Sequence, residues 1–196
     1  MSEWYAAKII RALHLQTFRG SVICVPNCYY TGYECDLLVV RESLKLVDVE
    51  VKISRSDLKS DIHKDKWWNH SQSWAYGDNK RPDPVRREWP PRIWKHYYAM
   101  PKEIWKPELE AAIPSASGIL LMNRSVDRYE REFISVEHYR RAKTNPAAQP
   151  IDVAGMRKIA YLSNVRMIEA DKRLCEIADE NRRLHSQLRC ETIAAN

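Results

Sequence analysis

Hydrophobic and charged positions alternate along residues 45–53 (KLVDVEVKI), where branched apolar residues are separated by Asp48, Glu50 and Lys52. Period-two alternation predicts a half-buried β-strand with apolar side chains on one face and charged side chains on the other. The preceding run, residues 34–40 (ECDLLVV), predicts a second strand. Residues 21–31 (SVICVPNCYYT) predict a third, which is broken or ends near Pro26 because proline cannot donate to a strand ladder.

Helical patterns lie on both sides of these strands. A short amphipathic helix is predicted over residues 3–15 from the apolar side chains of Trp4, Ala7, Ile10 and Leu13. A second helix is predicted from Ser54 to about Trp74. Ser54 or Ser56 can cap its first turn, which also contains Asp57.

The middle of the chain has a different composition. Residues 77–95 (GDNKRPDPVRREWPPRIWK) hold four Pro and six Lys or Arg residues, and they predict a long loop. Residues 96–100 (HYYAM) and 118–123 (GILLMN) predict two further strands, and residues 127–136 are a candidate for another. The segment 142–150 (AKTNPAAQP) predicts a linker.

One long helix is predicted from Asp152 to about Glu191, because this segment has no Pro and a single Gly. Its apolar residues recur at 3–4 spacing, which places three residues at position a and two at position d of a short coiled coil. The a positions are Leu174, Asn181 and Leu188, and the d positions are Ile177 and Leu184. The alternative is a helix that packs on its own domain. A coiled coil would serve a homodimer or a partner protein.

These patterns divide the chain of 196 residues into a domain at 1–141 with a basic insertion at about 77–95, a linker at 142–151 and a helix at 152–191. The formal net charge of +6 and the pI near 9.1 favour a polyanionic partner, either nucleic acid or an acidic membrane face. No apolar run reaches the roughly 20 residues of a membrane helix, and Met1 to Tyr5 do not open a signal peptide.

Cysteine usage favours a cytoplasmic protein with reduced thiols. The five cysteines include no C-x-x-C pair, and the odd count does not suit a disulfide framework. Cys24, Cys28 and Cys35 are close enough in sequence to raise a metal site as an alternative, but a fourth nearby ligand is lacking.

The strands at 34–40 and 45–53 are expected to form a hairpin that gathers charged groups. If the turn is the three residues 42–44, then Arg41 opposes Lys45 and Asp36 opposes Glu50. Lys52 leaves the same face as Glu50, because the two are separated by one residue on a strand. The weak point of this hairpin is a turn without glycine at its left-handed position.

Two opposed carboxylates repel each other unless a cation lies between them, and Mg²⁺ or Mn²⁺ would suit the oxygen ligands of Asp36 and Glu50. Such an ion polarises a phosphoryl group and activates water, while Lys52 would stabilise the developing negative charge. The alternative is a solvated sheet face with an ordinary cross-strand salt bridge.

The pattern D-x₁₃-E-x-K on a hairpin between two helices resembles the PD-(D/E)XK nuclease superfamily. The run from Glu50 to Asp57 (EVKISRSD), followed by Asp61 and Lys66-Trp67, resembles the MmcB-type DNA repair group within it. The segments 97–101 (YYAMP) and 117–120 (SGIL) fall where that group has its next two strands. The likeness spans about residues 20–125, and the proline of the superfamily name is replaced by Cys35.

This resemblance implies a restriction-endonuclease-like α/β core, in which a mixed central sheet is flanked by helices. It also implies that Asp36 and Glu50 hold the metal, that the backbone carbonyl of Val51 adds a ligand, and that Lys52 is the catalytic lysine. Members often add an acid from the first helix, for which Glu3 is the candidate here. Supporting roles are implied for Asp57 and Asp61, one helical turn apart, and for Gln72 and Tyr76, which have the Q-x-x-x-Y spacing of RecB-like members.

The basic loop is a candidate substrate contact. Its cations could meet phosphates and its tryptophans could stack on unpaired bases, although an ordinary solvated connection explains the composition as well. The residues concerned are Lys80, Arg81, Arg86, Arg87, Trp89, Arg92, Trp94 and Lys95.

Two hypotheses from different classes follow. The first is a Mg²⁺- or Mn²⁺-dependent nuclease that hydrolyses DNA in repair, phage DNA processing or defence. The second is a non-catalytic nucleic-acid-binding or assembly protein that keeps the nuclease-like fold and oligomerises through its C-terminal helix. The intact set of Asp36, Glu50 and Lys52 favours the first.

Overall fold

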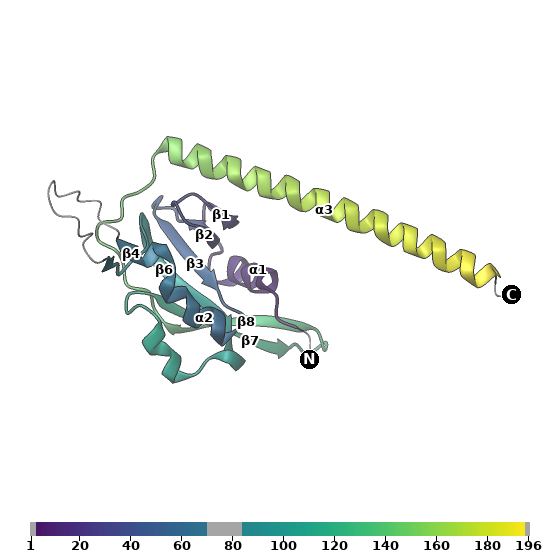
Figure 1. The fold of residues 1–196 in the computed structure, drawn as a ribbon, viewed down its shortest axis with the longest axis horizontal. Helices are drawn as coiled ribbons and strands as arrows, with labels where there is room; N and C mark the ends of the chain where they lie inside the picture. Colours follow the sequence, from purple (N-terminus) through teal and green to yellow (C-terminus); the bar gives the residue numbers. More distant parts are fainter. Residues whose placement is uncertain (1–2, 70–83, 195–196) are drawn as a thin grey trace, which may run out of the picture.

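The computed structural model describes residues 3–69 and 84–194. Its centre is a six-stranded mixed sheet with the strand order β1-β2-β3-β6-β7-β8 (Figure 1). The first three strands form an antiparallel meander, β6 and β7 continue the sheet parallel to β3, and β8 returns antiparallel. The strands are β1 (Ile23–Cys28), β2 (Cys35–Val40), β3 (Leu46–Val51), β6 (Ile93–Pro101), β7 (Gly118–Val126) and β8 (Glu132–Arg140). An α/β fold with a mixed central sheet is therefore confirmed.

One face of the sheet is covered by α1 (Ala6–Gln16). The helix buries Ile9, Ala12 and Leu13, which share one side because they are three and four residues apart. The predicted helix is confirmed, but the predicted contact positions Ala7 and Ile10 lie beside the buried stripe instead of in it. Beneath α1 the core is mainly aliphatic, including the valines of β3, and it also contains the rings of Phe18 and Tyr97.

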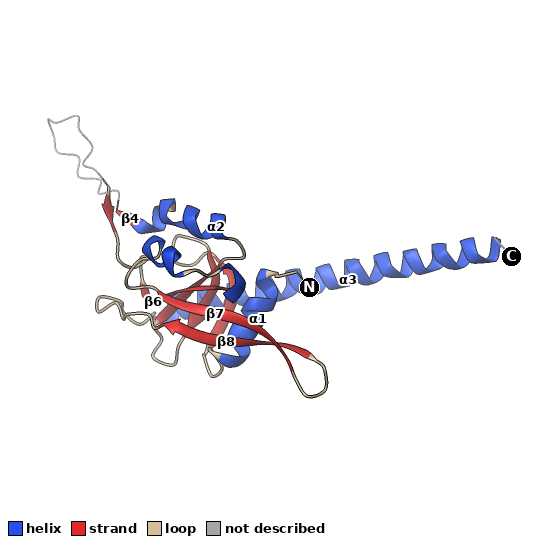
Figure 2. Cartoon of the chain, turned by 90° about the horizontal axis from the view of Figure 1, so that it is seen from below, coloured by secondary structure: helices blue, strands red, loops and turns tan. Residues whose placement is uncertain are grey.

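The opposite face carries two separate apolar clusters. The first turns of α3 (Val153–Ala194) cover β1 and β2, where Ile159 packs among Val25 and Leu38. The short helix α2 (Arg55–Ser60) and the turns that follow it cover β6 and β7, where Leu58 and Trp67 pack. Figure 2 shows the sheet between these layers. The charged side chains of β3 lie on this same face, between the two clusters.

The strand β1 continues through Pro26 instead of breaking there, contrary to the sequence-based prediction. Pro26 lies opposite Leu37, and the antiparallel pairing resumes at Cys28 opposite Cys35 after the left-handed Asn27. The strand tolerates proline because β1 is at the edge of the sheet, so the missing N–H deprives no second strand of a partner.

The predicted helix from Ser54 to Trp74 is wrong from Asp61 to Asn69, and residues 70–74 of the prediction lie outside the described residues. Ser54 does cap α2, and its hydroxyl accepts the N–H of Asp57 at 3.2 Å, but α2 ends at Ser60. Two 3₁₀ turns follow, η1 (Asp61–His63) and η2 (Asp65–Trp67), and then a short strand β4 (Trp68–Asn69) that pairs with β5 (Val85–Arg86). Residues 61 and 66 are about 140° apart on an ideal α-helix, so the 3₁₀ turns allow both to point at the sheet.

The predicted loop at 77–95 is shorter than expected at its C-terminal end. Residues 77–83 lie outside the described residues, and β6 already begins at Ile93. Trp94 and Lys95 therefore belong to a central strand, in which Lys95 pairs with Val47 of β3 and Trp94 lies at a bulge. The strand predicted at 96–100 extends over 93–101, and the candidate at 127–136 is β8 at 132–140.

Two 3₁₀ segments, η3 (Lys102–Ile104) and η4 (Pro107–Ala112), connect β6 to β7. The predicted C-terminal helix is confirmed as α3, which begins at Val153 after a linker without regular structure. Within residues 3–69 and 84–194, no helix combines the length and the apolar character that crossing a membrane requires.

Candidate active site

The β2–β3 hairpin has the register that the sequence predicts. Leu37 opposes Val49 and Val40 opposes Leu46, and these are the first and last pairs of the ladder. Asp36 and Glu50 are the next residues in the same register, and the Asp36 carboxylate accepts the N–H of Val51 at 2.7 Å. At the turn, the N–H of Arg41 donates to the Lys45 carbonyl at 3.1 Å. The three-residue turn and the pairing that it sets are therefore confirmed.

The turn puts Leu44 in the left-handed position that usually favours glycine, with φ of 58°. Two contacts hold it there. The Leu44 carbonyl accepts the N–H of Ile151 at 2.9 Å, and its side chain packs against the apolar cluster under α3. These tertiary contacts thus offset the conformational strain of a leucine at a position where glycine is usually preferred.

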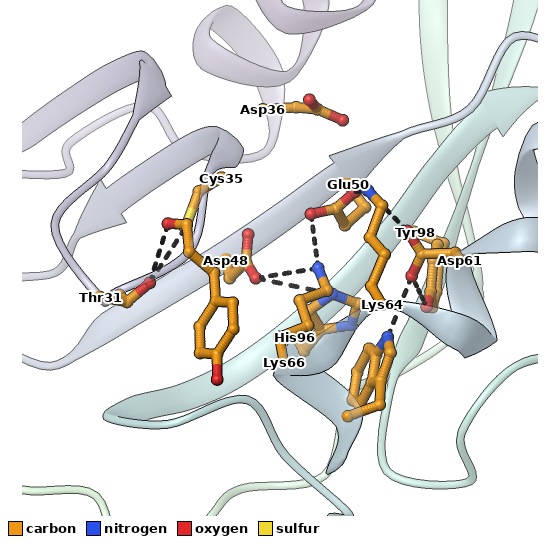
Figure 3. Close-up of polar contacts among 12 residues, drawn as sticks. Thr31, Cys35, Asp36, Asp48, Glu50, Asp61, Lys64, Lys66, His96 and Tyr98 are labelled. Carbon is orange, nitrogen blue, oxygen red and sulfur yellow. Dashed lines mark hydrogen bonds and ion pairs between the residues drawn. The ribbon is translucent and has the colours of Figure 1, made fainter.

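Asp36 lies at the border of the charged cluster (Figure 3). One of its oxygens, Oδ2, accepts the N–H of Val51 at 2.7 Å. Burial and the nearby negative charge of Glu50 raise the pKa of Asp36 above its ordinary value. No ion pair of the described chain includes Asp36, so its carboxylate is the one in this region that lacks an ammonium partner.

Glu50 is the centre of the cluster and is 1% exposed. Its Oε1 accepts Lys66 Nζ at 2.5 Å, and its Oε2 accepts Lys52 Nζ and Lys64 Nζ, each at 3.0 Å. Burial alone would raise the pKa of this carboxyl, but Lys66 and Lys52 outweigh burial and lower the pKa to about 2. The charged face of β3 is thus buried under the 3₁₀ turns, and the predicted half-buried strand is wrong in this respect.

Asp61 completes the cluster from the first 3₁₀ turn. Its Oδ1 lies 2.8 Å from Lys52 Nζ and 2.9 Å from Lys64 Nζ, while its Oδ2 accepts the Tyr98 hydroxyl at 2.5 Å. Burial alone would raise the pKa of Asp61, but Lys66 and Lys52, with the hydrogen bond from Tyr98, outweigh burial and lower it. Lys52 and Lys64 therefore bridge the same two carboxylate oxygens, Lys52 from inside the protein and Lys64 from the solvent side, where its side chain is 46% exposed.

Asp48, two residues before Glu50, has a raised pKa, whereas that of Glu50 is lowered. It is fully buried, its only ammonium contact in the described chain is Lys66 at 3.6 Å, and its Oδ1 has no hydrogen-bond partner there. Burial outweighs Lys66 and raises the pKa of Asp48 to about 6. Its Oδ2 lies 3.7 Å from Nε2 of His96, a ring whose pKa burial lowers well below its ordinary value.

We expect Asp48→Asn to stabilise the protein at pH 7 but not at pH 4. In the folded chain Asp48 takes up a proton near pH 6, whereas its ordinary pKa is 3.8. Between these values the folded state binds more protons, so the contribution of Asp48 to stability falls as pH rises. The advantage of asparagine should grow from near zero at pH 4 to at most about 3 kcal/mol above pH 6. Urea unfolding of both proteins at several pH values measures it, and a constant difference would contradict the assignment.

Ser117, His96 and Asp48 form a chain of the residue types used in nucleophilic catalysis. The Ser117 hydroxyl lies 2.9 Å from His96 Nδ1, and His96 Nε2 faces Asp48. Ser117 and His96 are both fully buried, at 0% exposure. A substrate cannot reach the serine oxygen, so this chain is a packing feature behind the charged cluster.

The remaining residues expected at the site fall into three groups. Asp57 and Asp61 do share a face, and Asp57 reaches Lys52 at 3.6 Å. Glu3 instead lies on the surface, where it accepts the Tyr5 hydroxyl at 3.0 Å, and it has no ion pair in the described chain. Gln72 and Tyr76 lie outside the described residues.

The predicted substrate-binding residues do not form one loop. Arg86 is exposed on β5, and Arg87 donates to Asn69 Oδ1 at 3.2 Å. Trp89 donates its indole N–H to the Lys143 carbonyl at 3.3 Å. The indole ring of Trp94 is half-buried against the core below α1, with the Lys95 ammonium 4.6 Å from its centroid. Arg92 has a left-handed backbone with φ of 66°, and Lys80 and Arg81 lie outside the described residues.

Several members of the cluster were not predicted as site residues from the sequence. Asp48 could have been found, because it leaves the same face of β3 as Glu50. Lys66 was part of the motif-like run, but its role depends on the 3₁₀ turn. The other members, Lys64, His96 and Tyr98, come from elements whose positions only the tertiary fold determines.

The charge and the ligand types of the cluster determine whether it can hold a divalent cation. In the described residues no three His, Cys, Asp or Glu side chains are grouped as a metal site, and Cys24, Cys28 and Cys35 are free thiols. The carboxylates nevertheless outnumber the ammonium groups, and the Lys64 ammonium already lies as a cation between Glu50 and Asp61. Charge and ligand type therefore suit Mg²⁺ or Mn²⁺, provided that Lys64 moves away. The carboxylates are Asp36, Asp48, Glu50, Asp57 and Asp61, and the ammonium groups are those of Lys52, Lys64 and Lys66.

Comparison with known proteins identifies a shared fold. No family model and no curated protein matches the chain. The structure is similar to that of "SPO1766 protein of unknown function from Silicibacter pomeroyi", with a TM-score of 0.50 and 15% sequence identity. The match covers 89% of this chain and 93% of that chain. At this identity the likeness concerns the fold alone.

Proposed function

We propose that this protein is a Mg²⁺- or Mn²⁺-dependent nuclease that hydrolyses DNA phosphodiester bonds, with Asp36, Glu50 and Lys52 as its active centre. The observation that carries the proposal is the β2–β3 hairpin, in which Asp36 accepts the N–H of Val51 at 2.7 Å and Lys52 donates to Glu50 at 3.0 Å. Strand pairing fixes these positions more firmly than a loop would. The net charge of +6 supports a polyanionic substrate.

Asp36, Glu50 and the backbone carbonyl of Val51 would hold the cation. A divalent cation at this position polarises the scissile phosphoryl group and lowers the pKa of a water molecule. The excess of carboxylates attracts the cation, and the unpaired Asp36 gains most from its charge. Lys64 has a half-exposed side chain, so it can release Glu50 and Asp61 at little cost.

Lys52 supplies a fixed positive charge. Its ammonium is held by Glu50 at 3.0 Å, Asp61 at 2.8 Å and Asp57 at 3.6 Å. A group that is held before the reaction begins needs no reorganisation when negative charge develops on the phosphate oxygens. When Lys64 leaves, the Lys52 ammonium loses its solvent-side cover and becomes accessible to the phosphate.

Cleavage of single- and double-stranded DNA with Mg²⁺ or Mn²⁺ tests the proposal. Glu50→Gln and Lys52→Met are expected to lose at least about a hundredfold in rate, because each removes a charge at the reacting phosphate. Glu34→Gln is the matched control, since Glu34 is an exposed acid close to Asp36 in sequence. Circular dichroism must show that each variant is folded. Equal rates in wild type and both site variants would contradict the assignment.

The same assay separates a second candidate, a non-catalytic nucleic-acid-binding or assembly protein. That function is favoured by one observation, which is that both Glu50 oxygens are already neutralised by lysines. It predicts DNA binding without cleavage in any divalent metal. Binding that survives Glu50→Gln unchanged, with no cleavage by wild type, would support this second function over the first.

A further inference from the structure

The second half of α3 carries an apolar stripe at Leu174, Ile177 and Leu184 that no other element of the described chain covers. All residues from 167 to 188 are exposed, and the helix continues beyond the folded domain (Figure 1). Leu174, Ile177 and Leu184 are 65%, 58% and 47% exposed. Leucine and isoleucine side chains exposed at regular helical spacing favour a packing partner.

This apolar stripe continues the side of α3 that packs on the domain. Upstream, Met156, Ile159 and Leu162 pack against the cluster below α3, and Arg166 donates to the Asn27 carbonyl at 2.8 Å and 3.1 Å. Successive residues of a helix are about 100° apart, so residues that are 18 positions apart lie on the same side after five turns. Leu174, Ile177 and Leu184 therefore lie on the same side as Met156, Ile159 and Arg166. We call this side of α3 the seam. The domain covers the seam up to Arg166, and beyond Arg166 the seam is exposed.

We propose that the open half of α3 pairs antiparallel with the same segment of a second copy of this chain, over about residues 167–191. The orientation follows from the position of the domain. In a parallel pair the first half of the partner helix would pass through this domain, which already occupies that side of α3. An antiparallel pair avoids the clash, because each domain lies beyond the end of the other helix.

The length of the helix matches this arrangement. In an antiparallel pair, each a position lies opposite a d position of the partner. Placing Leu174 (a) opposite the partner's Leu184 (d) gives a register in which the numbers of opposed core residues add up to 358. Arg166, the last residue bonded to the domain, then lies opposite position 192 of the partner, and α3 ends at Ala194. The partner helix therefore ends where the domain begins, and the open seam of about 40 Å is covered.

The same register identifies two unfavourable contacts. Asn181 meets the partner's Ile177, which leaves an amide against an apolar side chain. Glu180 meets its own copy, and salt screens this repulsion. We therefore expect Asn181→Leu to lower the dimer dissociation constant at least about tenfold, and added salt to lower it in wild type.

Sedimentation equilibrium of the full chain over a wide concentration range tests the pairing. Wild type is expected to dimerise, and Leu184→Asp is expected to stay monomeric because it buries a charge in the seam. Ser186→Asp is the matched control, since it introduces the same charge on the opposite side of the helix, and it should dimerise like wild type. A monomeric wild type, or a dimer that Leu184→Asp does not disrupt, would overturn the proposal.

Cross-linking determines the orientation in a background with Cys175→Ser and Cys190→Ser. Ala178 lies beside its own copy in the antiparallel register, so Ala178→Cys is expected to form an intermolecular disulfide under mild oxidation. Asn181 lies opposite its own copy only in a parallel pair. Disulfide formation by Asn181→Cys but not by Ala178→Cys would overturn the antiparallel arrangement. These readouts do not depend on the proposed nuclease activity.

Discussion

Replacement of Lys66 by Met is expected to destabilise the protein by about 3–5 kcal/mol, because it leaves buried carboxylates without their cation. Lys66 is 1% exposed and lies 2.5 Å from Glu50 and 3.6 Å from Asp48. Burial opposes its positive charge, yet Asp48 and Glu50 raise the pKa of Lys66 above its ordinary value. Without Lys66, Asp48 has no other ammonium partner in the described chain.

Lys64→Met provides the matched control for this experiment. Lys64 also binds Glu50, at 3.0 Å, but its side chain is 46% exposed and water can replace it. Its loss should cost about 1 kcal/mol or less. Urea unfolding at pH 7 compares the two variants. If Lys64→Met and Lys66→Met lose the same unfolding free energy, burial of the lysine does not determine how much each ion pair stabilises the protein.

A double-mutant cycle identifies which carboxylate depends on Lys66. Adding Asp48→Asn to Lys66→Met removes the charge that is left without a partner, so Asp48→Asn should stabilise the Lys66→Met protein by more than it stabilises wild type. A purely additive result would mean that Asp48 and Lys66 do not interact, despite their separation of 3.6 Å.

The hairpin could be predicted from the sequence because two local features determine it. Alternation assigns the faces of β3, and the length of the turn determines the partner of every residue in β2. A residue such as Leu44 at φ of 58° does not prevent the turn, because its cost is local and a carbonyl bond to Ile151 offsets it. The long helix α3 could be predicted for a similar reason, since no residue after Val153 interrupts it.

The cover over the charged face could not be predicted in this way. Alternation separates charged from apolar side chains, but it does not indicate whether the charged face contacts water. Here Lys66 and Trp67 turn inward from a 3₁₀ segment, in a region where helical propensity predicted a continuous helix. The packing of Trp67 on Tyr98, from a strand about thirty residues later, stabilises this local departure from the α-helix. Interactions at such separation leave no periodic signal in the sequence.

Asp36→Asn is expected to keep or raise the stability of the metal-free protein while it strongly reduces metal binding and cleavage. Burial and Glu50 raise the pKa of Asp36, so its ionised form costs stability at neutral pH and is relieved only by protonation or by a cation. Asparagine removes that charge and can still accept the N–H of Val51, as Asp36 does at 2.7 Å. Without metal, the variant is therefore expected to be at least as stable as wild type.

With Mg²⁺ or Mn²⁺ the order should reverse. Wild type should gain thermal stability on binding the cation, because a ligand that binds only the folded state stabilises it. Asp36→Asn should gain little, and its cleavage rate should fall about a hundredfold or more. Glu34→Gln, an exposed acid two residues away, should behave as wild type in both measurements. If Asp36→Asn keeps the metal-dependent rise in melting temperature, Asp36 is not a ligand. If it loses the rise and keeps cleavage, the metal site and the reaction are separate.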